Sequence, residues 1–228
     1  MKFSVLLLLG SLFACTQATD NSVLIASASS FRPALEMLAP TLNDKCNTNI
    51  QISSGSTGAL VTQIRQGAPF DLLVSADMNL SKSLANSLAN NYRLDAAFAK
   101  SPMAYWQPKA SAPKLTIAIA NPKTAPFGRA AMQVIGKSNP DLVTAANAGQ
   151  AFVFVHTKAA NAGYVPLPLL IAAKIPDTEF ELIADDAYSP IFLHNVRLKD
   201  NPTLDCLADQ LNALQTIAML AEFGYLPP

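Results

Sequence analysis

Three short turns place hydroxyl side chains, glycine or proline immediately before helix-like runs. They lie in IASASSFRPAL (25–35), ISSGSTGALVTQI (52–64) and IAIANPKTAPFGRAAM (117–132). In each segment an apolar, strand-like run leads into the turn. The first turn of a helix carries unpaired backbone N–H groups and the positive end of the helix dipole, so it attracts anions. These residue types therefore indicate anion binding by uncharged donors.

The candidate donors follow from the position of each turn. They are Ser30 before the first helix, Ser56 and Thr57 at the start of the second, and Phe127, through its backbone N–H, at the start of the third. No carboxylate lies at the centre of these turns, so a hydrogen phosphate would leave its O–H unpaired. We therefore expect a fully ionised tetrahedral oxyanion as ligand. The alternative for each turn is that its Ser or Thr only caps the helix.

Two arginines lie close to these turns. Arg32 falls two positions beyond Ser30 and points to nearly the opposite side of its helix, whereas Arg129 is placed to rim the cleft. Over the 228 residues, 16 Lys and Arg balance 16 Asp and Glu, which gives a formal net charge of zero. A nucleic-acid partner usually requires a basic surface, so none is expected.

An enzyme is the competing hypothesis, with a serine and either His156 or His194 as a hydrolase pair. The sequence has no G-x-S-x-G motif for a strained nucleophile turn, and no G-K-[ST] follows GSTGA as a nucleotide-binding loop would require. The two histidines are far apart and no Cys/His cluster has metal-ligand spacing. We therefore expect neither catalysis nor a cofactor.

Apolar periodicity alternates between strand-like and helix-like segments along the chain, which favours α/β sheets covered by helices. Strands are predicted at 23–26, 50–52, 70–74, 115–120, 151–155, 180–184 and 191–196. Helices are predicted after Ser30, through Leu60 and Ile64, through Leu80, Leu84 and Leu88, at 127–135 and 141–148, and as one long amphipathic helix at 204–214. In such sheets, ligands lie beyond the carboxyl ends of the strands.

The chain is predicted to fold into two lobes. Residues 22–100 with 188–228 form the first and 101–187 the second, because a Pro-containing stretch at 101–113 and a second stretch at 185–190 are typical of crossings between lobes.

The N-terminus predicts export. Residues 1–18, MKFSVLLLLGSLFACTQA, contain one basic residue, an apolar run and small residues, as in a secretory signal peptide. The run 12–15, LFAC, also resembles a bacterial lipobox, so Cys15 is alternatively a lipid-anchored N-terminus of the exported protein. Cys46 and Cys206 then remain, and in an oxidising compartment they form either a disulfide or two buried free thiols.

Several motifs resemble the periplasmic molybdate-binding proteins, the solute receptors of molybdate ABC transporters. The resemblance is strongest in SSGSTGALVTQIRQGAPFDLLVSAD (53–77), and ASASSFRPAL, ANPKTAPFGRAAM and the ending LAEFGYLPP are also similar. It extends from about residue 22 to the C-terminus. It implies a two-lobed periplasmic-binding-protein-like (type II) α/β fold, each lobe a mainly parallel sheet flanked by helices, that closes on molybdate or tungstate without chemistry. It also implies a monomer that works with an ABC permease in the inner membrane.

The resemblance also assigns roles to individual residues. Ser30 matches the first hydroxyl donor of the family, Thr57 with Ser56 beside it the second, and the Phe127 N–H a donor from the second lobe. A further backbone donor before a later helix falls on Ser138 or Asn139. His156 stands where the family has a tyrosine donor, and the alternative is that it packs at a strand end without contacting ligand. This departure, with a shortened second lobe, leaves open a receptor of the same fold for a different oxyanion or a small organic acid.

Overall fold

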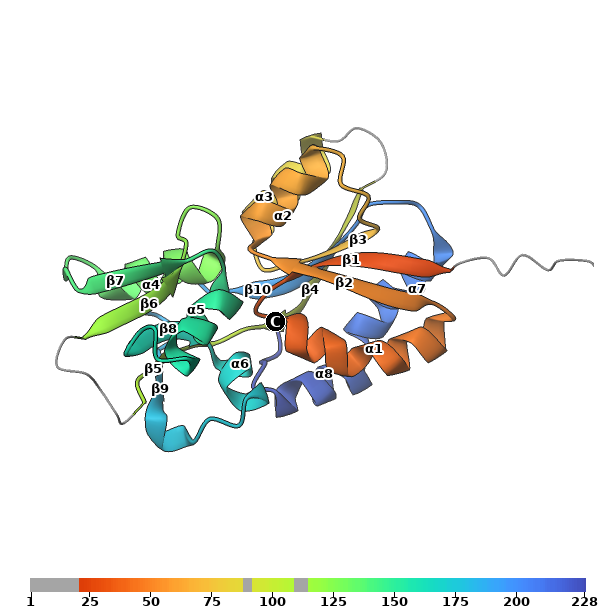
Figure 1. Cartoon of the computed structure of the whole chain (residues 1–228). Helices are drawn as coiled ribbons and strands as arrows, with labels where there is room; N and C mark the ends of the chain where they lie inside the picture. Colours follow the sequence, from red (N-terminus) through yellow and green to blue (C-terminus); the bar gives the residue numbers. More distant parts are fainter. Residues whose placement is uncertain (1–20, 88–91, 109–114) are drawn as a thin grey trace, which may run out of the picture.

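A computed structural model describes residues 21–87, 92–108 and 115–228. The predicted signal peptide (1–18), Cys15, Leu88 and part of the crossing at 101–113 lie outside the described residues. Two five-stranded sheets lie side by side, each with helices on both faces (Figure 1). Among the described helices, none is long and apolar enough to cross a lipid bilayer.

The first sheet has the strand order β2-β1-β3-β10-β4. Its strands are β1 (Ser22–Ala28), β2 (Asn49–Gly55), β3 (Leu72–Ser75), β4 (Arg93–Lys100) and β10 (Phe192–Arg197). Strands β2 and β3 pair parallel with β1, whereas β10 runs antiparallel to β3 and β4. Helices α2 (Thr57–Arg65) and α3 (Met78–Ser87) cover one face. The other face carries α1 (Arg32–Cys46), α7 (Pro202–Asn212) and α8 (Leu214–Glu222).

The second sheet has the order β7-β6-β8-β5-β9. Its strands are β5 (Met103–Trp106), β6 (Thr116–Ala120), β7 (Asp141–Ala145), β8 (Ala162–Pro166) and β9 (Phe180–Leu182). Its helices are α4 (Pro126–Ile135), α5 (Ala148–His156), α6 (Leu167–Ala172) and the 3₁₀ turn η1 (Asp177–Glu179). Both sheets have two parallel and two antiparallel pairings, so each is mixed, and the prediction of mainly parallel sheets is wrong.

The two segments that cross between the sheets lie next to each other, and the C-terminal end of the chain pairs with the end of β4. The Ser101 N–H donates to the Ile191 carbonyl at 2.8 Å, and the Tyr188 hydroxyl accepts from the Met103 N–H at 2.9 Å. Lys100 exchanges two backbone hydrogen bonds with Leu226. The strands of the two sheets fall on either side of the predicted lobe boundaries at 100/101 and 187/188, and this division of the chain stays a prediction.

Two predicted elements have the opposite secondary structure in the folded chain. The segment 141–148, predicted as a helix, contains strand β7, and the apolar run 151–155, predicted as a strand, lies inside helix α5. Asn147 explains the second error, because its side chain accepts a hydrogen bond from the Gln150 N–H and so starts a helix. Residues 141–145 instead pair in parallel with β6. The single helix predicted at 204–214 is also wrong, since α7 ends at Asn212 and α8 begins at Leu214.

A disulfide links Cys46, at the end of α1, with Cys206 in α7, where the Cα atoms are 5.7 Å apart. Of the two alternatives for this pair, the disulfide is therefore confirmed. It fastens the C-terminal helices to the face of the first sheet that α1 covers.

Candidate functional site

A small cavity lies where the carboxyl ends of strands from both sheets meet. The N-terminal ends of α1, α2, α4 and α5 reach it, and its lining includes Ser30, Ser56, Thr57, Phe127 and Ala148. Its volume is about 10 Å³. Four of the predicted site residues, contributed by segments of both sheets, therefore line one cavity.

The hydroxyl groups at this cavity do not cap their helices. None of α1, α2 and α4 has a side-chain hydrogen bond at its N-cap. In the described part of the chain, the Ser30 and Ser56 hydroxyls have no hydrogen-bond partner, although both residues are buried. The Thr57 hydroxyl accepts from the Ala76 N–H at 3.2 Å and keeps its own proton to donate. The helix-cap alternative is therefore wrong for Ser30 and Ser56.

Backbone donors at the cavity are also unpaired. The N–H groups of Ser30, Thr57, Phe127 and Ala148 donate to no acceptor among the described residues. Nearly all buried backbone N–H groups in proteins are hydrogen-bonded, so several unpaired ones around one space indicate a missing acceptor. Each of these amides stands at or beside the start of a helix, where the helix dipole also favours negative charge.

No charged side chain occurs among the described residues that line the cavity, and alanines and Gly55 fill most of the remaining wall. Small residues let the helix ends approach closely, so a ligand here would be surrounded by N–H and O–H donors. A compact anion suits such a space, because donors from several directions replace its hydration shell.

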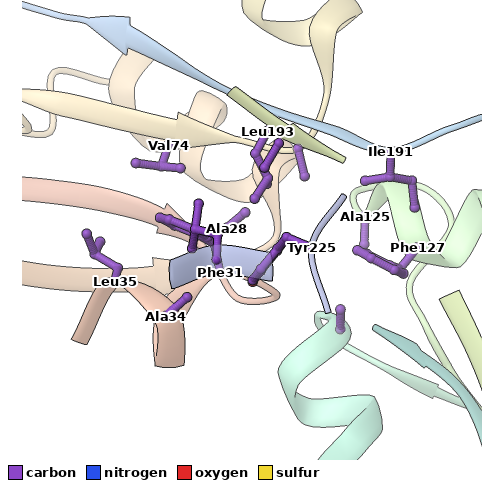
Figure 2. Packing of buried hydrophobic residues seen from close by; sticks show 14 of the residues in the cluster. Ala28, Phe31, Ala34, Leu35, Val74, Ala125, Phe127, Ile191, Leu193 and Tyr225 are labelled. Carbon is purple, nitrogen blue, oxygen red and sulfur yellow. The ribbon is translucent and has the colours of Figure 1, made fainter. Parts of the chain in front are cut away.

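Tyr225 positions Ser30 from the C-terminal end of the chain. Its hydroxyl donates to the Ser30 carbonyl at 2.8 Å, and burial raises the pKa of Tyr225, which keeps the phenol protonated. Phe31 packs edge-on against Phe98 and Tyr225, with ring centroids 5.5 and 5.7 Å apart. Figure 2 shows Phe31 next to Tyr225, and Phe127 in the same apolar cluster. This cluster fixes the start of α1 against the first sheet.

Three contacts join the halves of the molecule around the cavity. The Gly58 N–H donates to the Thr124 carbonyl at 2.9 Å, and the Gly149 N–H donates to the Ser29 hydroxyl at 3.2 Å. The third contact is an ion pair between Arg129 of α4 and Asp77 before α3. Residues 29, 58 and 77 belong to segments of the first sheet, so the structure is closed over the cavity.

Two predicted site residues lie elsewhere. Ser138, like its alternative Asn139, is exposed in the turn before β7, and the parallel pairing of β7 with β6 puts that turn at the opposite edge of the sheet. His156 is exposed at the last position of α5, where its ring stacks on Phe152 at 5.4 Å. It follows a helix and not a strand, because the run 151–155 is helical, and so the motif match for a tyrosine position fails.

One site residue was missed by sequence reasoning. Ala148, whose N–H faces the cavity, starts the helix that the sequence interpretation placed as a strand. A signal for it existed. Asn147 accepts from the Gln150 N–H, and the Gln150 side chain accepts from the Ala146 N–H at 2.7 Å, a reciprocal pattern close to a capping box.

The histidines do not form a catalytic arrangement with serine. His194 is fully buried in β10, and burial lowers its pKa, so it is neutral near pH 7. In the described residues neither His156 nor His194 hydrogen-bonds a serine hydroxyl, and no three His, Cys, Asp or Glu side chains gather as metal ligands.

A larger groove of about 550 Å³ runs between α1 and helices α5 and α6, and it shares Ser29 with the small cavity. Its polar residues are largely engaged already: Asn147 and Gln150 cap α5, and Arg32 pairs with Glu36. Unpaired donors therefore gather in the small cavity rather than in this larger groove.

The sequence as a whole matches a protein family. Residues 23–226 match the profile of the bacterial extracellular solute-binding proteins. The chain belongs to this family. The molybdate-binding protein ModA of Azotobacter vinelandii is 30% identical over an alignment of 250 positions, gaps included, that covers 99% of each chain. The molybdate-binding protein ModA of Rhodobacter capsulatus is 26% identical over 228 residues, covering 92% of this chain and 90% of its own.

Solved structures of solute-binding proteins share the fold. The periplasmic molybdate-binding protein of Azotobacter vinelandii superposes with a TM-score of 0.79 and 27% identity, covering 90% of this chain and 99% of that one. The sulfate-binding protein SubI of Mycobacterium tuberculosis gives a TM-score of 0.74 at 12% identity, with 91% and 87% coverage, and shows the fold alone. The predicted two-lobed periplasmic-binding-protein-like fold and the kinship with molybdate-binding proteins are both confirmed.

Proposed function

We propose that this solute-binding protein is a receptor for molybdate or tungstate, which it holds in the small cavity between its two lobes. One observation carries the proposal: unpaired N–H and O–H donors at the starts of four helices converge on a space that no charged side chain lines. A tetrahedral dianion would accept these hydrogen bonds and interact favourably with the helix dipoles. The relatives that are named molybdate-binding proteins support the choice of ligand.

The receptor acts, in this proposal, as an exported monomer. It delivers the oxyanion to an ABC permease in the inner membrane and performs no chemical step. Support comes from the signal-like sequence of residues 1–18 and from the similarity to a periplasmic molybdate-binding protein. Anchoring through Cys15 remains the alternative to free release. No cofactor is needed, since the donors that would hold the ligand belong to the chain itself.

Molybdate should stabilise the purified protein against unfolding. At a ligand concentration one hundred times Kd, binding to the folded state alone adds about 2.7 kcal/mol to the free energy of unfolding. Thermal unfolding with and without sodium molybdate, and with sodium tungstate in parallel, measures this. Unchanged melting with millimolar amounts of both salts would contradict the proposal.

A competition panel separates the proposed ligands from the alternatives. Sulfate, phosphate, thiosulfate and small carboxylates are titrated against the molybdate complex by calorimetry. We expect tungstate to compete most strongly, because it has the same shape and charge as molybdate. Small carboxylates should compete weakly, because their two acceptor oxygens cannot pair with all the donors that converge from the starts of four helices. Stronger competition by a carboxylate would instead support a receptor for an organic acid.

Removing the Ser30 hydroxyl should weaken molybdate binding. A hydrogen bond to a charged group contributes about 1.5–3 kcal/mol, so S30A should lose roughly ten- to hundredfold in affinity. His156→Ala is the matched control, because that side chain is exposed and stacks on Phe152 away from the cavity. Calorimetry measures the molybdate Kd of both variants. Equal losses of affinity in the two variants, or no loss in S30A, would show that Ser30 does not bind the ligand.

A further inference from the structure

Asp77 is a buried carboxylate next to a cavity that is proposed to hold a dianion. It follows Ala76, whose backbone lines that cavity, and its side chain is 6% exposed. One carboxylate oxygen accepts from the Leu80 N–H at 2.9 Å and so caps α3. The other oxygen accepts from the Arg129 guanidinium. An ionised carboxylate in this position would repel an oxyanion unless a cation balances it.

Arg129 supplies this balance from the other half of the molecule. It belongs to α4, which follows β6 of the second sheet, whereas Asp77 follows β3 of the first. The two residues also line a second cavity of about 230 Å³, which shares Ala76 and Pro126 with the small cavity. Among the described residues that line either cavity, Arg129 and Asp77 are the charged ones.

We propose that Arg129 is a positioning residue that acts through Asp77. When the lobes close, the Arg129 guanidinium pairs with the Asp77 carboxylate across the interface. The dianion then has no net negative charge beside it. This inference rests on the proposed oxyanion receptor function. Opening the lobes would separate the pair and expose the bound ligand to the charge of Asp77. The ion pair thereby links closure to retention of the oxyanion, and its loss would act mainly on the dissociation rate.

The pair fits this role better than a purely structural one. Arg129 is 44% exposed, so it does not need Asp77 for its own solvation, whereas the buried Asp77 carboxylate depends on its partners. Further hydrogen bonds join α4 to the crossing segment 185–190 beside it. Gln133 of α4 donates to the Ser189 hydroxyl at 3.1 Å and accepts from the Ser189 N–H at 2.7 Å. The second cavity therefore lies between α4 and the segments that contain Asp77 and Ser189.

The test compares the molybdate affinities of variants of this pair, with sodium molybdate as the probe. R129A should lower affinity by about tenfold to a hundredfold, a typical size for coupling between sites, with most of the change in the dissociation rate. The double variant D77N/R129A removes the uncompensated charge and should regain most of this loss, while Arg129→Lys keeps the charge and should lose least. Arg65→Ala, which deletes an exposed arginine that donates to the Ser83 hydroxyl, is the matched control and should bind like the wild type.

Each outcome has a distinct meaning. If the wild type fails to bind molybdate, the proposed function fails and this inference fails with it. If the wild type binds but D77N/R129A stays as weak as R129A, Arg129 acts on the ligand directly and not through Asp77, which overturns the inference. Wild-type affinity in R129A would also overturn it. Circular dichroism spectra and melting temperatures confirm that the variants compared are folded, and Arg129→Lys still tests the role of the charge if R129A does not fold.

Discussion

Gly58→Ala should abolish tight molybdate binding while the ligand-free protein remains folded. A Cβ atom at position 58 would lie 2.8 Å from the Thr124 carbonyl oxygen, which is closer than real Cβ contacts come. The contact atom belongs to the backbone, so no side-chain rotation relieves the clash. The same approach carries the hydrogen bond from the Gly58 N–H to Thr124. Because Thr124 lies on the opposite side of the cavity, relief of the clash requires the lobes to separate. Separation withdraws the Phe127 and Ala148 amides from the site.

The expected loss in affinity is therefore at least about a hundredfold, the sum of overpacking and of lost hydrogen bonds to a charged ligand. Stability in the absence of ligand should not fall, because alanine favours a helix over glycine by roughly 1 kcal/mol. Calorimetry with molybdate and thermal unfolding without it measure the two quantities separately.

Two other glycines serve as controls for Gly58. A Cβ at Gly149 would lie 3.3 Å from the Ser29 Cβ, so Gly149→Ala should weaken binding only slightly. A Cβ at Gly128 would overlap the Ala120 carbonyl within the same half, so Gly128→Ala should lower the melting temperature itself. Molybdate affinity like that of the wild type in Gly58→Ala would mean that the closed arrangement is not the binding form.

Local patterns in the sequence predicted the part of the site that consecutive residues encode. The spacing of Leu35, Leu38 and Leu42 predicts the buried face of α1, and the turn before it places Ser30 at the edge of β1. Similar reasoning brought Thr57 and Phe127 to helix starts. Because parallel strands direct their carboxyl ends to the same edge, these three residues were expected to converge, and they line one cavity.

The segment 141–156 could not be predicted in the same way. An apolar run of five residues fits a buried strand and a buried helix equally well by periodicity alone. Ala151 and Val155 are buried against β6 and β8, while Val153 is exposed, which is helical spacing that only becomes visible once the surrounding sheet is known. Because helix and strand were assigned the wrong way round in this segment, His156 was predicted at the site and the Ala148 amide was not.

Contacts between the lobes could not be predicted, because they depend on how the lobes are placed. Arg129 was expected only at the rim of a cleft, and its partner Asp77 lies 52 residues away in the chain. The hydrogen bond from Tyr225 to Ser30 spans 195 residues. No local pattern encodes such pairs, so the charge balance beside the cavity emerges from the folded structure.

Removing the disulfide should lower stability without changing the affinity for molybdate. Cys46 and Cys206 close a loop of 160 residues, and such a cross-link restricts the unfolded chain. Replacing both cysteines with serine should therefore reduce the free energy of unfolding by about 2–4 kcal/mol. Urea unfolding of the variant, and of the wild type with and without a reducing agent, measures this. Equal stability of oxidised and reduced wild type would show that the cross-link does not contribute.

Binding should be spared because the disulfide lies at the far end of α1 from the cavity. The helix has 15 residues, so about 22 Å separates Cys46 from the turn that carries Ser30. The aromatic contacts of Phe31 with Phe98 and Tyr225 fix that turn independently of the cross-link. The cysteine variant should thus lose stability and keep its molybdate Kd. Gly58→Ala should instead keep its stability and lose affinity for molybdate. A large loss of affinity in the cysteine variant would mean that the C-terminal helices, which the disulfide fastens to α1, also determine the geometry of the oxyanion site.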